Sequence, residues 1–168
     1  MESSVDIHFP GLEEALAPWR RATVAVATRG VPPHVTLLYP WKPPPLEPED
    51  LRDFARAVAG FRPFALVFTE VRCFPNGTVY LALRDETAPR AITRALAAAF
   101  PAYPPYGGAF PDPTPHLTVA KPAPERAAAV RAEVARALPL PFDARVDGLA
   151  IMVEDADGWW SVRHRHAL

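Results

Sequence analysis

The chain has 168 residues with a net charge of −1, which fits one domain whose core needs no covalent or metal staple. This charge balance excludes a protein that coats nucleic acid through phosphate contacts, but it allows a small phosphate pocket. The single cysteine, Cys73, excludes an internal disulfide and any multi-cysteine metal site. The sequence has no long apolar run and no signal-peptide pattern at its start, so we expect a cytoplasmic protein without membrane contact.

Proline accounts for 22 residues, against a usual share of about 5%. The prolines cluster between periodic segments and so mark the ends of elements. The patterns predict, in chain order, a strand at Ser3–Phe9, a helix at 11–20, a strand at Val35–Tyr39, a helix from Pro48 to Gly60, strands at Phe64–Arg72 and Thr78–Arg84, a helix at 87–100, a loop at Pro101–Pro115, a strand at Leu117–Ala120, a helix at Pro124–Leu138, and strands at Asp143–Val153 and Trp159–His166. This succession predicts an α+β fold with antiparallel hairpins.

Two segments, about half the chain apart, share one pattern of proline, histidine, apolar residue, threonine and apolar residue. They are the first motif, Pro33-His34-Val35-Thr36-Leu37, and the second motif, Pro115-His116-Leu117-Thr118-Val119. Residues i and i+2 of a strand point to the same face, so each histidine projects together with its threonine. A duplicated fold would bring the two strands together about a pseudo-twofold axis. The result would be a cleft with two imidazoles and two hydroxyls.

Such a cleft suits phosphodiester chemistry without a metal. A neutral imidazole takes a proton from the nucleophile and a charged one gives a proton to the leaving oxygen, each contributing about 10²–10⁴-fold. The threonine hydroxyls can donate to the non-bridging phosphate oxygens. The sequence leaves open which histidine is the acid and which the base, since the roles exchange with the direction of reaction.

The two motifs and their separation resemble the 2H phosphoesterase superfamily, in particular its 2′-5′ RNA ligase-like, or cyclic phosphodiesterase, branch. The stretch Gly30–Trp41 is similar to the first-motif region of that branch, and the ending Trp159-Trp160-Ser161-Val162 extends the resemblance over most of the chain. The resemblance implies one bilobal domain over residues 1–168. It implies two antiparallel sheets with flanking helices related by a pseudo-twofold axis, with one motif strand from each lobe facing a central cleft.

For function, the resemblance implies that the protein opens 2′,3′-cyclic phosphates of RNA ends or nucleotides to 2′-phosphates, or cleaves related 2′-5′ linkages. Reversible 2′-5′ RNA ligation would accompany this activity. Carried over by position, His34 and His116 would be the acid/base pair, and Thr36 and Thr118 the phosphate hydrogen-bond donors. No cofactor and no metal are expected. The partners would be short RNA ends or small nucleotides, not long duplexes, and the chain would be a monomer.

Residues near the motifs are candidates for substrate binding. Tyr106 and Phe110, in the loop before the second motif, would stack on a nucleobase or else plug the edge of a lobe. Lys121 would reach the cleft only if its strand ends by Pro122, and would otherwise be a solvated surface charge. Tyr39 continues the alternation of the apolar residues in the first motif, so we expect it to point toward the core.

Two other classes of function stay open. The same cleft would serve a non-catalytic module that binds RNA ends or nucleotides. A metal-dependent hydrolase would use both motif histidines as ligands, with Asp112 as a further ligand, although the motifs lack nearby carboxylates at ligand spacing.

Overall fold

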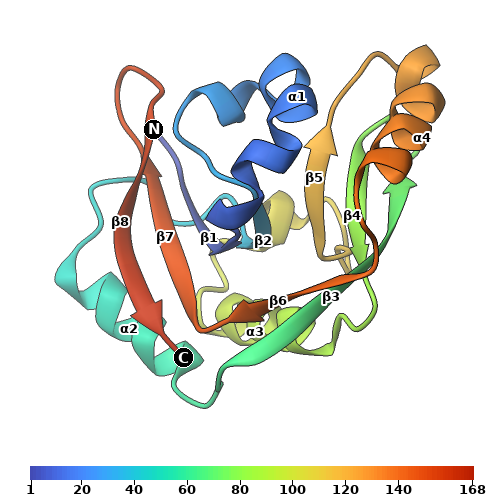
Figure 1. Cartoon of the computed structure of the whole chain (residues 1–168). Coiled ribbons are helices and arrows are strands. Elements are labelled where there is room, and N and C mark those ends of the chain that lie inside the picture. The colour runs from blue at the N-terminus through green and yellow to red at the C-terminus, as the bar shows by residue number, and fades with distance from the viewer.

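The computed structural model describes all 168 residues and confirms the α+β class (Figure 1). Its helices are α1 (Glu13–Thr23), α2 (Pro48–Val58), α3 (Thr87–Ala99) and α4 (Ala127–Ala137), with short 3₁₀ turns at Pro10–Leu12, Ala25–Thr28, Pro105–Gly108 and Pro124–Arg126. Its strands are β1 (Ser3–His8), β2 (His34–Leu38), β3 (Phe64–Cys73), β4 (Val79–Leu83), β5 (His116–Ala120), β6 (Phe142–Val146), β7 (Gly148–Glu154) and β8 (Trp160–Ala167). No helix is both long and apolar enough to cross a membrane.

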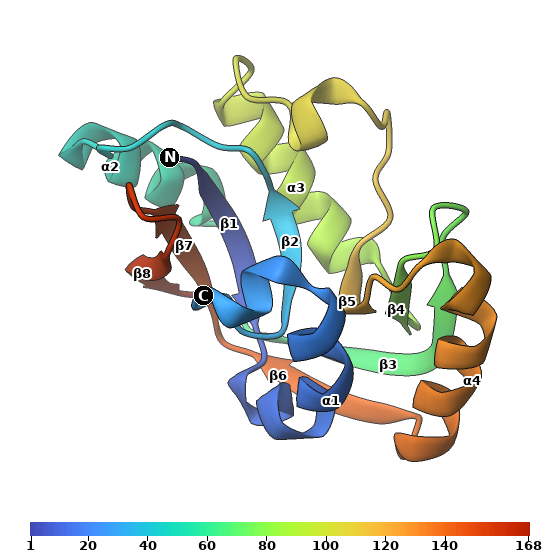
Figure 2. The same ribbon diagram turned by 90° about the horizontal axis from the view of Figure 1, so that it is seen from above.

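The eight strands form one antiparallel sheet in the order β6-β3-β4-β5-β2-β1-β7-β8. The two sheets expected from the sequence are the two halves of this sheet, four strands each, and the two motif strands β5 and β2 meet at its centre. Between these strands the register contains one residue pair, Val35 with Leu117. On each side of that pair, three further strands continue the sheet outward from the motif strand. This arrangement agrees with the expected pseudo-twofold axis. Figure 2 shows the strong curl that turns the two halves toward each other.

The helices are exchanged between the halves. Helix α1 follows β1 in the chain but packs against β5, and α3 follows β4 but packs against β2. Each helix contributes an apolar stripe to the main core, with Leu16 on α1 and both Ile92 and Leu96 on α3 fully buried. Their apolar spacing follows the helical period, which is why the sequence specifies amphipathic helices there. Each motif strand is therefore covered by a helix from the opposite part of the chain.

The sequence-based expectation of a single strand at Asp143–Val153 is wrong, because the chain forms two strands there. Strand β6 pairs with β3 at one edge of the sheet, whereas β7 pairs with β1 in the other half. The chain thus crosses between the halves at Asp147 without a turn. The core-facing positions shift by one residue there, from Phe142, Ala144 and Val146 to Leu149, Ile151 and Val153. Gly148 permits the crossing, since a Cβ there would lie 2.8 Å from the carbonyl oxygen of His166.

Candidate functional site

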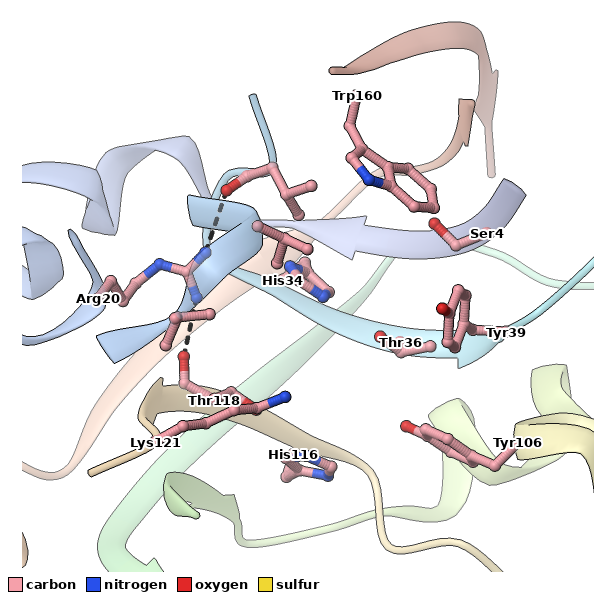
Figure 3. A pocket seen from close by; sticks show the side chains of 13 residues that line it. Ser4, Arg20, His34, Thr36, Tyr39, Tyr106, His116, Thr118, Lys121 and Trp160 are labelled. Carbon is pink, nitrogen blue, oxygen red and sulfur yellow. Dashed lines mark hydrogen bonds between the residues drawn. The ribbon is translucent and has the colours of Figure 1, made fainter. Parts of the chain in front are cut away.

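The two motifs meet in a cavity of about 250 Å³ at the seam between the sheet halves (Figure 3). Because β2 and β5 are antiparallel and Val35 pairs with Leu117, His34 is set toward Thr118, and Thr36 toward His116. The paired apolar residues are fully buried on the core side, and the four polar side chains line the cavity. The structure therefore brings together all four residues that the motifs single out.

Both imidazoles are held in the same way. The Nδ1 atom of His34 lies 2.8 Å from the carbonyl oxygen of Pro32, and that of His116 lies 2.7 Å from the carbonyl oxygen of Thr114. A carbonyl can only accept a hydrogen bond, so Nδ1 carries the proton in each ring. The neutral form then keeps its lone pair on Nε2, and protonation also occurs at Nε2. Each ring thus exposes one atom that either accepts or donates a proton.

His116 lies against an aromatic wall. Its ring is edge-on to Phe74, with centroids 4.8 Å apart, and to Tyr80, with centroids 5.3 Å apart. Burial lowers the pKa of His116 below its ordinary value, and the neighbouring charges of His34 and Lys121 act in the same direction. The neutral form of His116 is therefore favoured, which is the form that accepts a proton.

Two cationic side chains border the motifs. Arg20 on α1 is fully buried, and its guanidinium donates to the carbonyl oxygens of Thr118 (2.8 Å) and Val31 (3.1 Å) without forming an ion pair. Lys121 also lines the cavity, because β5 ends at Ala120 and the backbone N–H of Lys121 bonds to Thr23 of α1 (3.0 Å). Because the strand ends before Pro122, Lys121 can turn toward the site. This is the condition under which the sequence analysis expects Lys121 to reach the cleft.

An acidic side chain lies beneath the first motif. Asp6 on β1 is 1% exposed and pairs in register with Thr36. The hydroxyl of Ser4 donates to one of its oxygens, and the other has no hydrogen-bond partner. Burial raises the pKa of Asp6, in opposition to the charge of His34, which lowers it. At the equivalent place beside the second motif, β4 contributes Tyr80 in place of a carboxyl, so the two halves of the site are chemically unequal.

Tyr106 lines the same cavity as the motifs. Its backbone is left-handed, with φ 52°, which is strained for a residue other than glycine. The N–H of Tyr106 donates to the carbonyl oxygen of Tyr39 at 2.5 Å, which anchors the loop across the first motif. Burial raises the pKa of the Tyr106 phenol to about 12, and the negative charge of Asp6 adds to this effect. The phenol therefore stays protonated and able to donate a hydrogen bond into the site.

Phe110 lies farther out. It borders a second hollow of about 400 Å³, which adjoins the first at Tyr106, His116, Thr118 and Lys121. The ring of Phe110 is 59% exposed and edge-on to Tyr106, with centroids 5.8 Å apart. Phe74 and Asn76 line the same hollow. Of the three predicted substrate-binding residues, Tyr106 and Lys121 thus line both hollows, and Phe110 lies at the outer one.

Tyr39 does not point toward the core, so the sequence-based expectation is wrong. Strand β2 ends at Leu38, which is fully buried, and the alternation stops there. Tyr39 instead lines the cavity beside Trp160, with ring centroids 6.4 Å apart. Trp160 and Arg20 also line it without having been singled out from the sequence. A signal existed for Arg20, since it follows Leu12 and Leu16 at a spacing of four on one helical face.

The chain gathers no group of three or more histidine, cysteine, aspartate or glutamate side chains suited to hold a metal ion. Asp112, the acidic residue considered as a third ligand, forms an ion pair with Arg90. Absence of a cofactor remains a prediction from the sequence.

The family model described as the 2′-5′ RNA ligase superfamily matches residues 9–158. The chain belongs to this superfamily. This confirms the resemblance that the two motifs carry, and it makes the protein a member of the 2H phosphoesterase group. A search of curated proteins finds no matching sequence.

Solved structures of the same fold cover nearly the whole chain. The crystal structure of E. coli LigT complexed with 3′-AMP has a TM-score of 0.64 at 18% identity, covering 99% of this chain and 97% of LigT. The TT0787 protein of Thermus thermophilus has a TM-score of 0.58 at 22% identity, covering 100% of this chain and 98% of that one. Usb1 of Kluyveromyces marxianus has a TM-score of 0.58 at 13% identity, covering 99% and 97%. At these identities the likeness shows that the superfamily fold is shared.

Proposed function

We propose that this phosphoesterase-family protein opens 2′,3′-cyclic phosphates of RNA ends or nucleotides to 2′-phosphates, by acid/base catalysis with His34 and His116. One observation carries the proposal: both histidines and both threonines of the motifs line one cavity, and each ring is pinned through Nδ1 so that Nε2 is free. E. coli LigT has been crystallised in complex with 3′-AMP, which supports a nucleotide as the ligand of this chain.

The proposed reaction uses water as the nucleophile. One Nε2 atom takes a proton from the water as its oxygen bonds to phosphorus. The bond between phosphorus and O3′ breaks, and the other imidazolium gives its proton to O3′. The products are a 2′-phosphate and a free 3′-hydroxyl. Thr36, Thr118 and Lys121 stabilise the negative charge on the non-bridging oxygens. With a 5′-hydroxyl in place of water, the same steps form a 2′-5′ linkage.

The test is incubation of the purified protein with each of the four nucleoside 2′,3′-cyclic phosphates in the presence of EDTA, with 2′- and 3′-phosphate products resolved by chromatography. We expect 2′-phosphate from the wild type and a loss of at least about 10²-fold in kcat/KM for His34→Ala and His116→Ala. The matched control is His164→Ala, because this histidine lies on β8 and does not line the cavity. Full activity of the double variant His34→Ala/His116→Ala would refute the proposal.

The same assay tests the alternative functions. A binding module would hold the cyclic phosphate without releasing product, and its affinity would survive both substitutions. A metal-dependent hydrolase would lose activity in EDTA and regain it with added metal. Action as a monomer in the cytoplasm on short RNA ends is part of the proposal.

A further inference from the structure

The two halves of the site differ in the residue that follows each motif strand. Five residues after its histidine the second motif has Lys121, and at the same spacing the first motif has Tyr39. Both side chains line the cavity. The ammonium of Lys121 can donate to a phosphate, whereas the hydroxyl of Tyr39 donates to Glu2. The first motif therefore lacks the donor that Lys121 adds to the second.

Tyr106 brings a hydroxyl to this place from outside both motifs. Figure 3 shows its phenol oxygen directed into the cavity on the side of Thr36, while Lys121 lies beside Thr118. Two pairs of donors thus border the cavity. One pair is Thr118 with Lys121, and the other is Thr36 with Tyr106.

The backbone fixes the position of Tyr106 before any ligand binds. Its N–H donates to the carbonyl oxygen of Tyr39 at 2.5 Å, and its carbonyl oxygen accepts a hydrogen bond from the N–H of Ala109 at 3.1 Å. Its φ of 52° is strained for a residue with a side chain. A strained conformation that is held by its surroundings at a site points to a function for the side chain that it directs.

The phenol of Tyr106 is suited to donate a hydrogen bond. Burial raises its pKa to about 12 and the charge of Asp6 adds to this effect, while hydrogen bonding with Thr36 acts in the opposite direction. The hydroxyl therefore keeps its proton at any pH at which the histidines exchange theirs. A fixed neutral donor in a buried place stabilises negative charge that develops next to it.

We propose that Tyr106 is a further catalytic residue, whose phenol donates a hydrogen bond to one non-bridging oxygen of the reacting phosphate together with Thr36. Thr118 and Lys121 bind the other non-bridging oxygen. This inference rests on the proposed function. As water bonds to phosphorus, negative charge grows on both oxygens, and each then faces two donors. Tyr106 keeps its proton throughout, and its bond strengthens with the charge, so it lowers the barrier more than it tightens substrate binding.

The first experiment measures kcat and KM for adenosine 2′,3′-cyclic phosphate in EDTA. Tyr106→Phe removes the hydroxyl and keeps the ring, so base stacking or packing by the ring would survive it. We expect kcat to fall by about 10- to 10³-fold with KM within about threefold of the wild type. The matched control is Tyr103→Phe, because this half-buried tyrosine of the same loop lines neither hollow. It should leave both values unchanged.

The second experiment uses the two diastereomers of adenosine 2′,3′-cyclic phosphorothioate, in which sulfur replaces one or the other non-bridging oxygen. Sulfur is a weak hydrogen-bond acceptor. Tyr106→Phe should therefore lower kcat strongly for the diastereomer that presents oxygen to Tyr106, and much less for the one that presents sulfur. A merely structural effect of the substitution would lower kcat equally for both.

The results separate the inference from the proposed function. Wild-type kcat in Tyr106→Phe would overturn the inference, and a loss of affinity in Tyr106→Leu would then assign the role to the ring. Equal losses on the two diastereomers would overturn it as well. Absence of turnover in the wild type would instead refute the proposed function, and the inference that rests on it. Because Tyr106→Phe removes a single oxygen atom, its melting temperature should match that of the wild type.

Discussion

Phe74 stands edge-on to the imidazole of His116, with ring planes at 83°. One face of Phe74 is stacked on Tyr80, with centroids 4.1 Å apart. Together these rings keep water away from the second motif, and burial is the main cause of the lowered pKa of His116. A residue between β3 and β4, outside both motifs, therefore contributes to the acid/base behaviour of this histidine.

Phe74→Ala should raise the pKa of His116 toward its ordinary value of 6.5. The substitution lets water reach the ring, so that less of the burial effect remains. An NMR titration of the histidine ring signals measures the shift, and the limb of the pH–rate profile that belongs to His116 should move to higher pH. Phe110→Ala, at the outer rim of the same hollow, is the control and should leave the titration in place. An unchanged pKa in Phe74→Ala would contradict this account.

His8 should make the protein less stable in acid. Burial is the main cause that lowers its pKa to about 3, with the charges of His34 and Arg165 adding to the effect. Between pH 6.5 and 3 the unfolded chain binds a proton here that the folded chain does not, so the free energy of unfolding falls as the pH falls. The slope from this group is at most about 1.4 kcal/mol per pH unit. Urea unfolding of His8→Phe at about pH 7, 6 and 5 should show a shallower loss than the wild type. A slope equal to that of the wild type would argue that His8 binds its proton in the folded state.

Arg20→Met should destabilise the fold by about 3 kcal/mol, since it removes two charge-assisted hydrogen bonds and leaves the carbonyls of Val31 and Thr118 without these donors. Activity should fall as well, because these bonds tie α1 to the second motif and to the segment just before the first motif. Urea unfolding gives the first value and the cyclic phosphate assay the second. The matched control, Arg21→Met, removes an exposed side chain with one loose ion pair and should lie within about 0.5 kcal/mol of the wild type.

Gly30→Ala should cost at least about 2 kcal/mol. The φ of Gly30 is +91°, and a Cβ there would lie 2.3 Å from the carbonyl oxygen of Trp160. Trp160 would have to move, and because it lines the cavity, cleavage of 2′,3′-cyclic phosphates should fall as well. Gly11→Ala is the control, since nothing lies within 4 Å of its added Cβ and its φ is not positive. Wild-type stability of Gly30→Ala in thermal melting would show that the backbone relaxes freely there.

The centre of the site could be predicted from the sequence because it depends on local rules. A period of two places His34 with Thr36, and repetition of the motif implies a symmetric partner. The structure agrees, and the pairing of Val35 with Leu117 supplies the register. Element order was equally accessible, since prolines and glycines mark most of the boundaries.

The rest depends on pairing between distant segments. Asp6 meets Thr36 only through the β1–β2 register, which no local pattern specifies. The expected direction of the Tyr39 side chain is wrong because that direction depends on where the hydrogen bonding of β2 stops. The sequence-based expectation of one strand is wrong at Asp147 because β6 and β7 follow each other without a turn, although they pair with different strands and their core-facing positions shift by one residue. Arg20 lies at the helical spacing of Leu12 and Leu16. Its burial is nevertheless not expected from the sequence, because arginine is rarely buried without a partner charge.

The exchange of α1 and α3 between the two halves bears on how this architecture holds together as a unit. A half taken alone would expose the apolar side of its motif strand, because the helix that covers it belongs to the other half. The two halves therefore depend on each other for their stability. We therefore expect unfolding in a single cooperative transition, with loss of either lobe abolishing the other.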